Sequence, residues 1–109
     1  MLYFAYGSNL NWHQMFKIRC PEAKYIRQHN LAGYKLVFSH YDPSRVFGHA
    51  NIEKKKGLKV PGAIWKITKK NENTLDVYEG YPIYYQKKYF IYKEQRVLVY
   101  IQKKFIKRK

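Results

Sequence analysis

The sequence is poor in the residue types that would build a disulfide framework, a membrane span or a metal site. It has one cysteine, Cys20, in 109 residues, so an intrachain disulfide is impossible. No apolar run approaches the roughly 18 residues that a transmembrane helix needs. The four histidines show no metal-site spacing such as H-E-x-x-H, and we expect neither a metal nor a cofactor. These absences favour a protein of a reducing compartment, and we expect a cytoplasmic location without membrane association.

Acidic residues are also scarce. The chain has seven acidic and 22 basic side chains, which gives a net charge of +15. Such a charge attracts anions and also keeps a tyrosine-rich protein soluble. The segment 81–93 interleaves aromatic rings with Lys87, Lys88 and Lys93, a combination that can hold single-stranded nucleic acid. A strand with one solvent-facing side would show the same alternation, so nucleic-acid binding is kept only as an alternative role.

Length and patterning predict one α+β domain over 1–109. Hydrophobic residues make up 46% of the chain, which is enough for a compact core. Many short strand-like runs favour a small mixed β-barrel of about six strands with two flanking helices, because closure hides sheet edges. The predicted strands are 2–6, 24–40 (one long strand or two, bent at Gly33), 46–53, 58–68, 84–94 and 96–105. The predicted helices are 10–19 and 69–78. The pair 46–53 and 58–68 is predicted to be a hairpin with its tip at 54–57, and residues 102–109 a basic tail.

The first candidate site is the junction between the first strand and the first predicted helix. Tyr6, Gly7, Ser8, Asn9 and Leu10 follow a short apolar run and precede a helical pattern. A strand that turns into a helix N-terminus gathers backbone N–H groups at one point, which suits a carboxylate or another anion. Strand–turn–helix junctions with Ser or Asn caps are common, so this pattern alone is a weak indication of function.

The second candidate is Glu79, at the end of the helix predicted over 69–78. Gly80 follows it as a helix-terminating glycine. A carboxylate at a helix C-terminus meets the negative end of the helix dipole, and aromatic neighbours remove water from it. Both effects would raise its pKa towards the range that is useful for general acid–base catalysis. An exposed, solvated glutamate is the alternative interpretation.

Taken together, the two segments resemble the γ-glutamylcyclotransferase, or AIG2-like, superfamily. The resemblance rests on the loop 6–10, on Pro61–Ile67 as a central strand, and on the segment 75–85 with Glu79-Gly80-Tyr81-Pro82. It covers nearly the whole chain in order. The family fold that it implies is a small β-barrel with flanking helices. One departure is Lys87, at a position where related sequences often have arginine.

The resemblance implies a metal-independent enzyme and assigns roles to single residues. Glu79 matches the acid–base glutamate, the loop from Tyr6 to Leu10 matches the segment that holds the γ-glutamyl group, and Tyr85 matches a tyrosine at the border of the pocket. The implied reaction is intramolecular: the α-amine of a γ-glutamyl compound attacks its own γ-carbonyl, giving 5-oxoproline and a free amine or amino acid. A γ-glutamyl-binding module without turnover is the second alternative. The leaving amine and the oligomeric state are not predicted.

Overall fold

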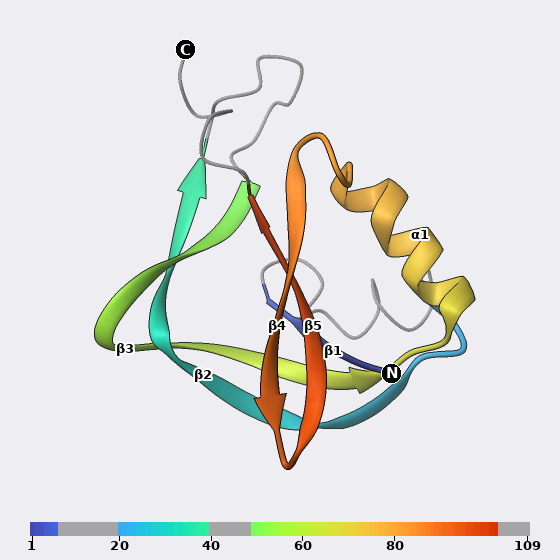
Figure 1. Ribbon diagram of the computed structural model, residues 1–109, viewed down its shortest axis with the longest axis horizontal. Helices are drawn as coiled ribbons and strands as arrows, with labels where there is room; N and C mark the ends of the chain where they lie inside the picture. Colours follow the sequence, from blue (N-terminus) through green and yellow to red (C-terminus); the bar gives the residue numbers. More distant parts are fainter. Residues whose placement is uncertain (7–19, 40–48, 103–109) are drawn as a thin grey trace.

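The computed structural model describes residues 1–6, 20–39 and 49–102, and these form a curled mixed sheet with one helix (Figure 1). The sheet has five strands in the order β2-β3-β1-β5-β4. Their bounds are β1 Leu2–Ala5, β2 Lys24–Ser39, β3 His49–Lys66, β4 Tyr85–Tyr92 and β5 Gln95–Gln102, and the helix α1 is Lys69–Glu79. All neighbouring strands are antiparallel except β1 and β5. The predicted helix over 10–19 lies outside the described residues.

The long β2–β3 hairpin corrects one prediction. Lys54-Lys55-Lys56-Gly57 was expected to be a hairpin tip, but β3 continues through it, and the chain reverses between Ser39 and His49 instead. Ala32 pairs with Lys59, but Tyr34, two residues later, pairs with Lys54. Residues 55–58 therefore lie opposite Gly33 alone, as an irregularity in the pairing of β2 with β3. Gly33 and Gly57 both have positive φ, at 86° and 90°. The glycines therefore bend two paired strands rather than closing a turn.

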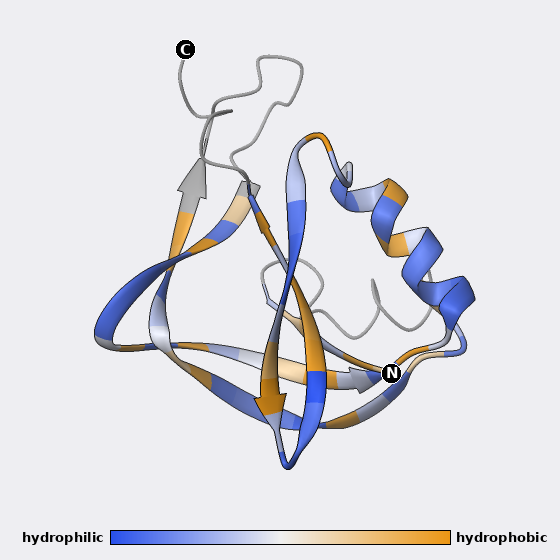
Figure 2. Ribbon diagram, in the orientation of Figure 1, coloured by the Kyte–Doolittle hydropathy of each residue, from blue (hydrophilic) through white to orange (hydrophobic). Residues whose placement is uncertain are grey.

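The helix α1 begins and ends as its sequence predicts. Thr68 is the N-cap, and its side chain and that of Asn71 form a reciprocal capping box. At the other end Gly80 takes the left-handed conformation, with φ 72°. Figure 2 shows that the helix is largely hydrophilic, and Val77 is 82% exposed. Leu75 is the one apolar helix residue that is fully buried, so polar contacts must supply much of the attachment of α1 to the sheet.

Two apolar clusters lie on the two faces of the sheet. On the face that α1 covers, here called the helix face, Tyr3, Trp65, Leu98 and Tyr100 pack with Leu75. The opposite side, here called the inner face, is built from eight buried residues, Leu2, Phe4, Leu31, Ile52, Val60, Ile64, Val97 and Val99. The alternation of side chains along β1 and β5 divides the residues between these faces.

The sheet curls towards its inner face but does not close into a barrel, so the barrel prediction is wrong. β2 and β4 are the two edges, and the described residues form no backbone ladder between them. Side chains bridge the edges instead: the ring of His29 in β2 stacks on Phe90 in β4 at 5.7 Å, and Arg27 Nη1 donates to the Tyr92 hydroxyl at 3.2 Å. The ring of Phe4 also packs against His29. The two edges therefore meet through side chains and not through a backbone ladder, and strand number alone could not predict this.

Candidate active site

Three of the predicted site residues come together at one end of the sheet. Tyr6 follows the end of β1, Glu79 is the last residue of α1, and Tyr85 is the first residue of β4. Tyr85 is buried, and Tyr6 and Glu79 are half-buried. The other predicted members of the site, Gly7 to Leu10, lie outside the described residues, so the predicted amide cradle stays a prediction.

The pKa of Tyr6 is affected by the other residues of this cluster. Burial raises the pKa of its phenol well above the ordinary value, and the neighbouring Tyr85, Glu79 and Tyr3 raise it further. The influence of Glu79 on Tyr6 means that two groups 73 positions apart in the sequence share one environment. Tyr6 is therefore neutral at physiological pH and is unsuited to act as a base in this site.

The hydroxyl protons of both tyrosines are directed at backbone carbonyls. Tyr6 donates to the carbonyl of Tyr100 at 2.5 Å, and Tyr85 donates to the carbonyl of Ala50 at 2.8 Å. A tyrosine hydroxyl has one proton, so towards any further partner the Tyr6 oxygen is an acceptor. It is suited to an ammonium group of a ligand and unsuited to stabilising an oxyanion.

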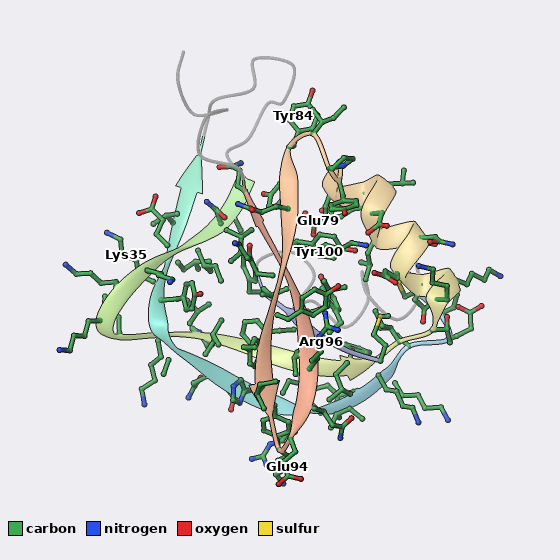
Figure 3. All side chains as sticks on the ribbon, viewed as in Figure 1. Lys35, Glu79, Tyr84, Glu94, Arg96 and Tyr100 are labelled. Carbon is green, nitrogen blue, oxygen red and sulfur yellow. The ribbon has the colours of Figure 1, made fainter. Side chains whose placement is uncertain are left out.

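The chain around Glu79 is fixed by the way α1 ends. The N–H of Tyr81 donates to the carbonyl of Asp76 at 2.9 Å and that of Gly80 to Val77 at 3.2 Å, the two bonds of a Schellman motif. A Cβ on Gly80 would lie 2.6 Å from the ring of Tyr84, so glycine is needed here for space as well as for its positive φ. The last turn of α1 contains no basic residue. Figure 3 shows Glu79 in the region between α1 and the β4–β5 hairpin, near Tyr100.

A buried charged network ties this end of the molecule together, and the sequence did not reveal it. The ammonium of Lys87 in β4 lies 2.7 Å from the Glu72 carboxylate and 3.2 Å from that of Asp76. The Tyr100 hydroxyl donates to Asp76 at 2.5 Å, and the Lys87 ammonium also lies 4.3 Å from the centre of the Tyr81 ring. A glutamate in a polar helix is normally a surface residue, but the side chain of Glu72 is 5% exposed. From the sequence, Lys87 was notable at this position only because related sequences often have arginine there.

The pKa values in this network follow from its hydrogen bonds. The hydrogen bond from Lys87 lowers the pKa of Glu72 although burial opposes this. Burial also disfavours the Lys87 ammonium, but the hydrogen bonds to Glu72 and Asp76 outweigh it and raise the pKa of Lys87. Burial, and then the bond to Asp76, raise the pKa of Tyr100. The ion pair is therefore charged throughout the physiological range. Because the Tyr100 carbonyl also holds Tyr6, the network links α1, β4 and β5 to the end of β1.

Comparisons with known proteins identify the family of this chain. The family model described as "Gamma-glutamyl cyclotransferase, AIG2-like" matches residues 3–108. This chain belongs to that family. It is 40% identical to the Gamma-glutamylcyclotransferase of Homo sapiens over 83 residues, and 37% identical to that of Bos taurus over the same length. A solved structure named Gamma-glutamyl cyclotransferase is 28% identical and superimposes with a TM-score of 0.76, covering 94% of this chain and 66% of that one.

The match to the curated family members is partial in length. Each alignment covers 72% of this chain but 44% of the relative, so the chain spans less than half of the curated relatives that it matches. Within the described residues, no group of three His, Cys, Asp or Glu side chains could hold a metal ion, and no helix is long and apolar enough to cross a membrane. The family match covers the segments that contain Tyr6, Glu79 and Tyr85.

Proposed function

We propose that this protein is a γ-glutamyl cyclotransferase, with Glu79 as the general base and acid. The observation that carries the proposal is the meeting of Glu79 with Tyr6 at one end of the sheet, in a chain of this family. The position suits proton transfer, because Glu79 is the last residue of α1 and a carboxylate at a helix C-terminus meets the negative end of the helix dipole, which favours its protonated form. The proposal extends to a cytoplasmic enzyme that needs no metal or cofactor for its chemistry.

The reaction closes a ring within one substrate molecule. The α-ammonium of the γ-glutamyl group loses a proton to Glu79, and the freed amine attacks the γ-carbonyl carbon. A C–N bond forms in a five-membered ring, Glu79 returns the proton to the departing nitrogen, and the original amide C–N bond breaks. The ring nitrogen loses its second proton to the released amine, which leaves as an ammonium. The products are 5-oxoproline and a free amine. Because nucleophile and electrophile belong to one molecule, the protein has to fold the substrate into the attacking conformer rather than collect two reactants.

The residues around Glu79 have roles that fit this sequence. Tyr6 can accept a hydrogen bond from the α-ammonium, since its own proton is directed at Tyr100. Tyr85, fixed by the Ala50 carbonyl, forms a rigid aromatic border. The γ-glutamyl carboxylate and the developing oxyanion require donors, and the backbone of the loop from Gly7 to Leu10 is the proposed source.

The proposal is tested by following 5-oxoproline with mass spectrometry. The protein is incubated with γ-glutamyl-alanine and with N-acetyl-γ-glutamyl-alanine, in which the nucleophilic amine is blocked. We expect 5-oxoproline and alanine from the first compound and no alanine from the second. Release of glutamate, or of alanine from the blocked compound, would show hydrolysis. Binding of the first compound without any product would support the γ-glutamyl-binding module instead.

A further inference from the structure

A cavity of about 890 Å³ lies between the β2–β3 hairpin and the β4–β5 hairpin. Tyr34, Ile52 and Ile101 line it, and all three pack in or against the inner-face cluster. Tyr85 of the proposed active site packs on the helix face. Among the described residues, the lining contains neither Tyr85 nor Glu79. The cavity is therefore distinct from the proposed active site.

The space between the two hairpins is filled at one end and hollow at the other (Figure 1). Near the β4–β5 turn, Phe90 and Tyr92 pack against the ring of His29 from β2. Gln86 and Lys88, earlier in the same strand, line the cavity instead. The volume is within the range of natural small-molecule sites, roughly 300–1,000 Å³. The hollow end is thus large enough for a ligand.

Two lysines from opposite hairpins give the cavity a positive charge. Lys54 in β3 and Lys88 in β4 both line it, and neither forms an ion pair in the part of the chain that the structure describes. The lining also includes the carboxylate residue Glu53. Side chains alternate along a strand, so that of Glu53 lies on the opposite side of β3 from those of Ile52 and Lys54. The cavity therefore suits an anion, and lysine is a common ligand of phosphate.

Gln102 adds an unmet hydrogen-bonding capacity to the lining. The residue is 1% exposed, and its backbone N–H donates to Asn51 Oδ1 at 2.7 Å. Its side-chain Nε2 and Oε1 atoms are buried and have no hydrogen-bond partner among the described residues. Buried amides are nearly always hydrogen-bonded, because an unsatisfied one is costly. Rotation of the Gln102 side chain towards the cavity would let a ligand with an adjacent donor and acceptor satisfy both atoms.

The aromatic and amide side chains of the cavity match a heteroaromatic base. Tyr34 presents a half-buried ring, and bases stack on such rings. A glutamine amide pairs with the adjacent N6 donor and N7 acceptor of adenine. We propose that the cavity binds a purine nucleoside monophosphate, with its phosphate at Lys54 and Lys88 and its base at Tyr34 and Gln102. The site stands independently of the proposed cyclotransferase function.

The phosphate contact is tested by calorimetry with adenosine 5′-monophosphate and with adenosine, which lacks the phosphate. Lys88→Gln is expected to weaken binding of the monophosphate about tenfold, the lower range for a hydrogen bond to a charged group, and to leave adenosine unchanged. Lys35→Gln removes the same charge from β2 outside the cavity lining and should change neither ligand (Figure 3). An equal effect of the two variants, or no binding of the monophosphate by the wild type, would overturn the site.

The base contact is tested with Gln102→Leu and with ribose 5-phosphate, which lacks the base. Replacing an unsatisfied buried amide by an apolar group should keep or raise the melting temperature. The affinity for adenosine 5′-monophosphate and for adenosine should fall, while that for ribose 5-phosphate stays the same. Gln102→Met serves the same purpose if the branched side chain packs badly. A lower melting temperature with unchanged affinity for all three ligands would overturn the role of Gln102.

Two further measurements separate this site from other functions. Tight binding of a single-stranded oligoadenylate by a protein that does not bind the monophosphate would replace the proposed site by a nucleic-acid surface. The affinity of Glu79→Gln for the monophosphate should equal that of the wild type, because Glu79 is outside the lining. Release of 5-oxoproline without nucleotide binding would reject this site alone, and nucleotide binding without such release would reject the cyclotransferase function alone.

Discussion

The helix face and the inner face of the sheet are stabilised by different kinds of interaction. The inner face joins its edges through apolar and aromatic contacts, with His29 packed among Phe4 and Phe90. The helix face has an apolar core too, but α1 is attached largely through Lys87 and its two carboxylates. Apolar contacts are tolerant of small shifts, whereas a hydrogen-bonded ion pair fixes both distance and direction. The proposed catalytic glutamate belongs to the element that is positioned by the directional contacts.

The difference between the helix face and the inner face is tested most strongly by removing the charge of Lys87. Lys87→Met removes the closer of the two cations beside the buried Glu72, leaving it only the longer contact to Lys69, and removes the cation beside the half-buried Asp76. Breaking a fully buried pair costs about 3–5 kcal/mol. We expect urea denaturation to show a loss of this order in the free energy of unfolding. Lys87→Arg should retain most of the stability, because a guanidinium can bind both carboxylates.

Position and pH provide the controls for this prediction. Lys88→Met changes the neighbouring, exposed residue and should alter stability by less than about 0.5 kcal/mol. The pKa of Glu72 is lowered in the folded protein, so the unfolded chain binds its proton first as the pH falls. The contribution of the pair is therefore present above the ordinary carboxyl pKa and is lost in acid. An equal loss in Lys88→Met would contradict the special place of Lys87.

Tyr100→Phe tests the next link of the network. The change removes only the hydroxyl that donates to Asp76, and hydrogen bonds to charged groups contribute about 1.5–3 kcal/mol. On the inner face, Ile64→Val removes one buried methylene group and should cost about 0.5–1.5 kcal/mol. Thermal or chemical denaturation of both variants gives the ranking. If the inner-face change costs more, directional contacts do not dominate the attachment of α1.

The smallest expected effect is a pH dependence on the inner face. Burial, and then the charge of Arg27, lower the pKa of His29, while Phe4, Phe90 and Tyr92 surround its ring. The unfolded state therefore binds this proton first, and stability should fall as the pH drops below about 6.5, the ordinary histidine value. His29→Phe should show a smaller loss between pH 7.5 and 5.5. Parallel pH profiles for the two proteins would remove His29 as the cause.

Local signals in the sequence predicted the elements whose ends are set by neighbouring residues. Thr68 and Gly80 mark the bounds of α1. The pair β4 and β5 also lies close to its predicted position, with Lys93 and Glu94 at positive φ between the strands. Caps and turns act over a few residues, so a sequence contains the information directly.

Features that depend on distant partners could not be predicted in this way. Glu72 is buried against Lys87, 15 residues later, at 2.7 Å, and its local pair with the exposed Lys69 would be expected of a surface residue as well. The lysine run at 54–57 has the composition of a turn, but pairing with β2 keeps it within a strand. Glu79 was a candidate from its place at the helix end, Tyr85 could be named only through the family resemblance, and their meeting with Tyr6 came from the structure.

The most direct test of the account is the rate of 5-oxoproline release by Glu79→Gln. Glutamine keeps the size and hydrogen-bonding capacity of glutamate but cannot accept the ammonium proton. General acid–base catalysis contributes roughly 10²–10⁴-fold, so kcat at saturating γ-glutamyl-alanine should fall by at least about that factor. The melting temperature should stay close to that of the wild type, because the substitution leaves the Schellman motif and the Lys87 network in place. Wild-type turnover by a folded Glu79→Gln protein would contradict the assignment of Glu79 as the proton shuttle.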